Sequence, residues 1–165
     1  MEQILLDTNF VSVLFDSRRP NFDAVKARAQ AFTENDLIYL SAIVLAELRY
    51  GMEAAQRAGQ DISHIRHTLL QGATYPLAEV GRHTAEAYGD VKARLADHYL
   101  DLARRPPRWI ENWQDRASGQ MLQVDENDLW IVAQAVERDY LLLTSDQRLA
   151  DRFCPAIAEL RVEVV

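Results

Sequence analysis

The sequence contains a single cysteine and no apolar run long enough to span a bilayer. Because Cys154 has no partner, no internal disulfide framework can form, which fits a protein of a reducing compartment. The first residues also lack the basic, apolar and small-residue order of a secretory signal peptide. We therefore expect a cytoplasmic protein that is not associated with a membrane.

A surplus of positive charge is also missing. The 165 residues carry a net charge of −7, which argues against a protein that holds nucleic acid on a broad basic face. The charge does not exclude an enzyme that reaches phosphates through a bound cation. The sequence has no Gly-rich phosphate loop of either common type. No set of cysteines and histidines completes a zinc site.

What the sequence does contain is an alternation of strand-like and helical patterns. Short apolar runs at residues 4–6, 37–40 and 141–144 are typical of buried parallel strands. The stretches between them show helical spacing of apolar residues. A run at 160–165 alternates apolar and polar residues, as an edge strand does. The sequence therefore predicts one α/β domain over residues 1–165, with helices on both faces of a parallel sheet.

Acidic residues occur where such a sheet would place a functional site, beyond the carboxyl ends of its strands. Asp7 directly follows the first strand, and Glu47 lies about a turn and a half into the helix after the second. Asp128 starts the helix that leads into the strand ending at Thr144, and Asp146 lies two residues beyond that strand. We therefore expect all four acids to reach the same rim of the sheet.

Each acid also has a simpler structural interpretation. Asp7 and Asp146 can cap the short helices that follow them. Asp128 can be a first-turn acid that the helix dipole favours, or it can pair with Asp125 in a capping arrangement. Glu47 can lie on a solvated helix face, although its neighbours in sequence are mostly apolar. Taken singly, these interpretations remain open.

Taken together, four ionised carboxylates need a counter-charge. Two carboxylates roughly 5 Å apart repel by about 3 kcal/mol at an effective dielectric constant of about 20. They also raise one another's pKa. Mg²⁺ or Mn²⁺ is the simplest counter-charge, since these ions take oxygen ligands and keep several waters for a substrate phosphate. The sequence thus predicts a metal site that activates a water for attack on a phosphodiester.

Three separated blocks of the sequence, LLDTNF, SAIVLAELRYG and ENDLWIVAQAVERDYLLLTSD, together resemble a PIN-domain ribonuclease. The resemblance is greatest to the VapC-like toxins of type II toxin–antitoxin systems. It implies a three-layer α/β/α sandwich and a metal-dependent endoribonuclease with an RNA substrate. It also implies a homodimer that an antitoxin protein inhibits.

The resemblance assigns roles to the same four acids. Asp7, Glu47, Asp128 and Asp146 match the family's acidic positions, and would be both catalytic residues and ligands of Mg²⁺ or Mn²⁺. Two more residues resemble polar groups that orient water or carboxylates in such enzymes, namely Asn9 and Thr144.

Residues 101–123 depart from the family pattern, which usually has only a short link here. The segment concentrates four arginines and two tryptophans in an otherwise acidic chain, namely Arg104, Arg105, Arg108, Arg116, Trp109 and Trp113. It can be a substrate arm whose arginines contact phosphates and whose tryptophans stack on unpaired bases. It can instead be an added helix that docks Trp109, Ile110 and Trp113 against the body. We favour the docked helical insertion, with the arginines exposed in either case.

Two other functions remain open. One is an aspartyl-phosphate phosphatase with Asp7 as nucleophile. A haloacid-dehalogenase-like enzyme would have a second Asp two residues later, where this sequence has Asn9, and a receiver domain would need a Lys that LLLTSD lacks. The other is a non-catalytic PIN scaffold that binds RNA or protein, although acids at all four positions argue against a decayed site.

Overall fold

Five parallel strands form the sheet at the centre of the protein. The structure is a computed structural model that describes residues 1–165, and its strand order is β3-β2-β1-β4-β5. The strands are β1 Gln3–Leu6, β2 Leu37–Ser41, β3 Leu77–Ala78, β4 Leu141–Thr144 and β5 Arg161–Val164. The predicted parallel α/β sheet is therefore confirmed.

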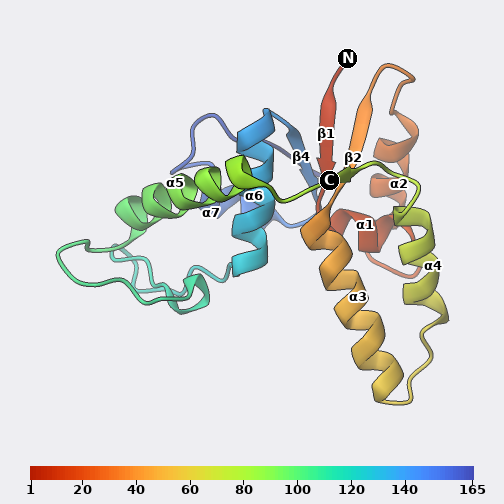
Figure 1. The fold of residues 1–165 in the computed structure, drawn as a ribbon, viewed down its shortest axis with the longest axis horizontal. Coiled ribbons are helices and arrows are strands. Elements are labelled where there is room, and N and C mark those ends of the chain that lie inside the picture. The colour runs from red at the N-terminus through yellow and green to blue at the C-terminus, as the bar shows by residue number, and fades with distance from the viewer.

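Helices flank this sheet on both sides. They are α1 Thr8–Leu14, α2 Phe22–Gln30, α3 Ala42–Arg57, α4 Ser63–Gly72, α5 Arg82–Tyr99, α6 Glu126–Arg138 and α7 Gln147–Phe153. Figure 1 shows α1, α2 and α4 on one side of the strands and α5, α6 and α7 on the other, which gives the three expected layers. None of the helices combines the length and apolar character needed to cross a bilayer.

The two central strands are covered on both faces. In β1, Ile4, Leu5 and Leu6 are all at most 1% exposed, and in β4 Leu142 and Leu143 are fully buried. This burial explains why both strands are continuous apolar runs, because a parallel strand between two helical layers has no solvent face. The edge strand β5 is only half-buried, in agreement with its alternating sequence.

The strand order opens a crevice at the carboxyl ends of β1 and β4. The connections from β1 to β2 and β3 run through α1 to α4, whereas the return to β4 runs through α5 and α6. Neighbouring strands thus lead into helices on opposite faces, which is where α/β sheets bind ligands. Leu6 pairs with Leu143, and the Asp7 amide donates to the Leu143 carbonyl over 3.0 Å. Asp7 and Thr144 therefore lie side by side at the carboxyl ends of neighbouring strands.

Residues 101–123 form a loop that extends from the end of α5 and returns to the start of α6 (Figure 1). Its only helix is one 3₁₀ turn, η1 (Ile110–Asn112), so the expected helical insertion is reduced to a single turn. Pro106 and Pro107 precede this turn and disfavour a longer helix, because proline lacks the amide donor and restricts the residue before it. Ile110 and Trp113 are buried as expected, but Trp109 remains 50% exposed.

Candidate active site

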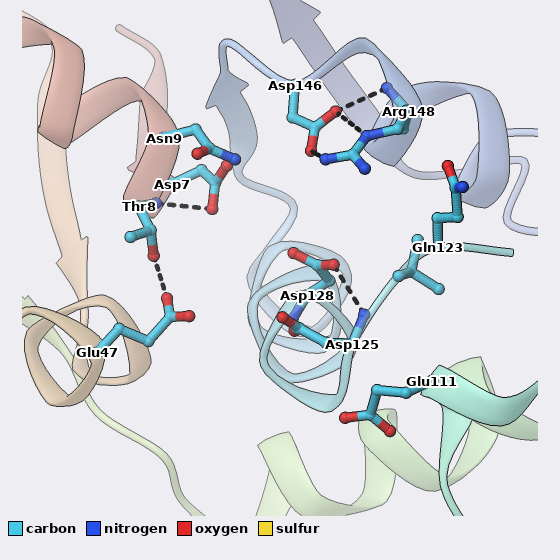
Figure 2. A pocket seen from close by; sticks show the side chains of 11 residues that line it. Asp7, Thr8, Asn9, Glu47, Glu111, Gln123, Asp125, Asp128, Asp146 and Arg148 are labelled. Carbon is cyan, nitrogen blue, oxygen red and sulfur yellow. Dashed lines mark hydrogen bonds and ion pairs between the residues drawn. The ribbon is translucent and has the colours of Figure 1, made fainter. Parts of the chain in front are cut away.

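A cavity of about 430 Å³ lies at the carboxyl ends of β1 and β4, beside the first turn of α6. All four acids predicted from the sequence line it, namely Asp7, Glu47, Asp128 and Asp146. Figure 2 shows them arranged around the cavity on four separate elements. The structure thus brings together side chains that lie up to 139 positions apart in the sequence.

Asp7 is both a helix cap and a cavity residue. Its Oδ1 accepts from the Thr8 amide over 2.7 Å, which caps α1, and its Oδ2 accepts from the Thr144 hydroxyl over 2.7 Å. The residue is 1% exposed. Burial raises the pKa of the Asp7 carboxyl to about 6, and the charge of Glu47 adds to the rise. The cap interpretation is therefore correct but incomplete.

Asp128 has the same double character. It forms a capping box with Asp125, in which each side chain accepts from the other residue's amide, over 2.9 and 3.0 Å. Burial raises the pKa of the Asp128 carboxyl to about 7, and the charges of Asp125, Asp7 and Asp146 contribute to that rise. Two carboxyl groups in the cavity thus resist ionisation.

Glu47 joins three helices. Its carboxylate accepts a hydrogen bond from the Thr8 hydroxyl at the start of α1, and another from Asn127 Nδ2 of α6 over 3.0 Å. Glu47 itself belongs to α3. The alternative of a merely solvated helix face is therefore wrong, since the carboxylate is directed toward the cavity and has fixed partners (Figure 2).

Asp146 already has a positive partner. It caps α7 through the Arg148 amide over 2.9 Å, and the guanidinium of Arg148 contacts both carboxylate oxygens over 2.9 and 3.2 Å. The Thr144 hydroxyl accepts from the Asp146 amide over 2.9 Å while it donates to Asp7. Thr144 therefore links two of the four acids. Asn9 lines the same cavity.

The four carboxylates share the cavity without converging on one point. No group of three or more Asp, Glu, His or Cys side chains is placed so that it could hold a metal ion. Glu47 and Asp146 are turned toward their internal partners, Thr8 and Arg148. The donors are nevertheless all oxygen, and no basic side chain forms an ion pair with Asp7 or Asp128, whose pKa values burial raises. The residues fit a hard divalent cation in their chemistry, and side-chain rotation would have to bring them together.

The sequence did not identify several residues that line this cavity. They are Thr8, Glu111, Gln123, Val124, Asp125 and Arg148. Three of them lie within three residues of a predicted acid, namely Thr8, Asp125 and Arg148. Proximity in sequence to the acids could therefore have identified these three. Glu111 and Gln123 come from the 101–123 segment, where no periodic pattern indicated their position. Arg104, Arg105 and Arg108 do not line the cavity and are exposed.

Comparisons with known proteins agree with this arrangement. Residues 4–152 match the PIN domain family, whereas no curated protein sequence matches the chain. The fold resembles that of VapBC2 from Rickettsia felis, with 18% identity, 98% of each chain covered and a TM-score of 0.69. VapBC-5 from Mycobacterium tuberculosis gives 23% identity over 100% of each chain and a TM-score of 0.64. VapC20 from M. tuberculosis is 13% identical, with 90% of this chain and 93% of that chain covered and a TM-score of 0.54.

These structural neighbours share the fold at identities too low to transfer a residue role. The match to the family itself covers most of the chain, from the first strand to the helix after Asp146. It includes all four acids that line the cavity. The chain therefore belongs to the PIN-domain family.

Proposed function

We propose that this protein is a divalent-metal-dependent endoribonuclease that acts as the toxin of a toxin–antitoxin pair. One observation carries the proposal: acids from four separate elements line one cavity, where two of their pKa values are raised by burial and by their neighbours. Such a concentration of partly buried carboxyl groups destabilises a fold unless a cation balances their charge.

Asp7, Glu47, Asp128 and Asp146 would hold Mg²⁺ or Mn²⁺. A bound divalent cation supplies positive charge that neutralises a phosphodiester and acidifies a water. The hydroxyl of Thr144 orients Asp7, while Thr8 and Asn127 orient Glu47. Arg148 neutralises Asp146 in the structure, and it is the one cation that lines the cavity and can contact a substrate phosphate.

The comparisons support the toxin assignment. Several structural neighbours are VapBC assemblies, and the M. tuberculosis neighbour VapC20 is described as a toxin that cleaves the sarcin–ricin loop. By analogy, we propose an RNA substrate, an antitoxin protein and a homodimer for this chain, in the cytoplasm. The aspartyl-phosphate alternative has no comparable support.

The decisive test is cleavage of bacterial RNA by the purified protein in Mn²⁺, with Asp7→Asn and Glu47→Gln as inactive variants. Each should lower cleavage by about 100-fold or more, because even groups that only support a metal ligand change activity 10- to 100-fold. Titration calorimetry should show weaker Mn²⁺ binding by both variants. Expression of the wild type, but not of Glu47→Gln, should arrest growth.

Asp97→Asn is the matched control, since Asp97 is an exposed acid on α5 that does not line the cavity. It should behave as the wild type does. Cleavage that survives the double variant Asp7→Asn/Asp128→Asn would contradict the proposal. RNA binding without turnover in Mn²⁺ would instead support a non-catalytic scaffold.

A further inference from the structure

The outer surface of the 101–123 segment carries an aromatic and basic face, which we define as Arg104, Arg105, Arg108 and Trp109. All four side chains are exposed, and Trp109 is 50% exposed. The Arg108 guanidinium lies over the Trp109 ring, 4.6 Å from its centre. None of the three arginines forms an ion pair, although acids outnumber basic residues in this protein. This face therefore presents positive charge outside any ion pair, beside an indole that is half-exposed.

Hydrogen bonds on both sides of Arg108 and Trp109 hold this face in place. Trp113 Nε1 donates to the Pro107 carbonyl over 2.8 Å, and Lys92 Nζ donates to the Arg108 carbonyl over 3.4 Å. On the other side, the Ile110 amide donates to Glu126 Oε1 over 3.3 Å. Buried Ile110 and Trp113 fix the backbone further. The exposed pair is thus anchored and does not sit at the tip of a free loop.

The same contacts connect the face to the acidic cavity. Glu126 is the first residue of α6, and its carboxylate also pairs with Lys92 over 2.6 Å. Glu111, two residues after Trp109, lines the cavity and accepts from the Glu126 amide over 3.3 Å. Figure 2 shows Glu111 and Gln123 on the opposite side of Asp125 and Asp128 from Glu47. The backbone segment that carries the face therefore also supplies one wall of the cavity.

We propose that this face binds single-stranded RNA next to the scissile phosphate, with a base stacked on Trp109 and phosphates paired with Arg104, Arg105 and Arg108. Exposed aromatic rings bind unpaired bases by stacking, and arginines bind the backbone. Residues 104–110 hold three arginines and no acid, and positive charge of one sign favours a polyanion over a protein surface of mixed charge. This inference rests on the proposed nuclease function, because the strand it binds is the substrate.

The test measures affinity for a fluorescein-labelled 12-nucleotide oligouridylate by anisotropy, with Mg²⁺ present and in the Asp7→Asn background. Trp109→Ala should weaken binding by about 10-fold, and Trp109→Phe should restore most of the loss. The triple variant Arg104→Gln/Arg105→Gln/Arg108→Gln should reduce the slope of log affinity against log salt by about 2. Arg57→Gln, an exposed arginine near the end of α3, is the matched control and should change neither value.

Cleavage by the protein with Asp7 intact separates this inference from the proposed function. Trp109→Ala should raise KM for bacterial RNA about 10-fold and leave kcat unchanged, since the ring lies outside the cavity. If the protein cleaves RNA but these variants change neither affinity nor KM, the proposed RNA-binding role of the face is wrong, while the proposed nuclease function is supported. If it binds the oligonucleotide through Trp109 but cuts no RNA, the nuclease is wrong, and the face binds RNA that is not a substrate. Self-association that depends on Trp109, with unchanged strand affinity, would identify a protein contact and overturn the inference.

Discussion

The acidic cavity and the 101–123 segment beside it are positioned in different ways. Asp7, Asp125 and Asp146 are helix caps, so each stands where a regular element begins. Arg108 and Trp109 lie in irregular backbone that Lys92, Trp113 and Glu126 hold by side-chain contacts. The first region follows from strand order and helix boundaries, whereas the second depends on packing between distant side chains. Variants in the two regions should therefore differ in their effects on stability, metal binding and pH dependence.

The largest expected effect comes from Trp113→Ala. Trp113 is 2% exposed and packs in the core, so its removal should lower the free energy of unfolding by about 3–5 kcal/mol. Trp109→Ala, in the same segment, should cost less than about 1 kcal/mol because its ring is half-exposed. Urea denaturation of both variants measures the difference. Equal losses of unfolding free energy would contradict the assignment of Trp113 to the core and Trp109 to the surface.

The metal-free protein should lose stability as the pH rises. The folded-state pKa of Asp7 is about 6 and that of Asp128 about 7, both above the ordinary value of 3.8, so the folded protein binds these protons more tightly. Their contribution to stability is complete below about pH 4 and is lost as pH rises to about 7. Between pH 5 and pH 8 the loss should be on the order of 4 kcal/mol.

Thermal unfolding in EDTA at pH 5, 6, 7 and 8 measures this loss. Asp7→Asn should flatten the profile, because it removes one titrating group and one neighbouring charge of Asp128. Added Mn²⁺ should restore the wild type at pH 8. A wild-type stability that increases from pH 5 to pH 8 without metal would contradict the buried, unpaired state of these carboxyl groups.

Glu126→Gln should disturb the 101–123 segment while leaving every cavity acid in place. The Glu126 carboxylate accepts from Tyr88, Lys92 and the Ile110 amide, so the amide side chain would leave at least one donor unsatisfied. We expect a loss of about 1–3 kcal/mol in unfolding free energy, measured by urea denaturation. Glu86→Gln, an exposed acid on α5, is the control and should change stability by less than about 0.5 kcal/mol.

Arg148→Gln should have the smallest effect. It frees Asp146 from its internal cation, so Mn²⁺ should bind more tightly. Arg148 is 60% exposed, and solvent screening limits such a pair to about 1 kcal/mol, which corresponds to about fivefold in affinity. Titration calorimetry with Mn²⁺ measures the change. Weaker Mn²⁺ binding in this variant would show that Arg148 helps to form the site and does not compete with it.

The sequence predicted the sheet, the helical layers and the family because these depend on local patterns. Continuous apolar runs predicted the central strands, and acids directly after them predicted the rim of the cavity. The four acids do line one cavity, while their catalytic and metal-binding roles stay predictions. For Asp7, Asp128 and Asp146 the sequence offered a cap or a functional acid, and the structure shows that one carboxylate can be both cap and cavity residue.

The 101–123 segment could not be predicted in the same way. Three apolar residues at helical spacing suggested one docked face, but Trp109 points outward while Ile110 and Trp113 are buried. The hydrogen bonds that decide this involve Lys92 and Glu126, which lie 17 positions before and after Trp109 in the sequence. Nor could the sequence reveal that Arg148 neutralises Asp146, since the pairing depends on how α7 begins.

Because these acids both cap helices and line or border the cavity, the choice of substitution matters when this protein is mutated. An alanine at position 7, 125 or 146 would delete the acceptor that starts a helix, and the protein would lose part of its architecture together with its chemistry. Asparagine keeps one acceptor oxygen and removes only the charge. An alanine scan across this cavity would therefore report misfolding as loss of function, and only charge-neutral replacements of the same shape can distinguish the two.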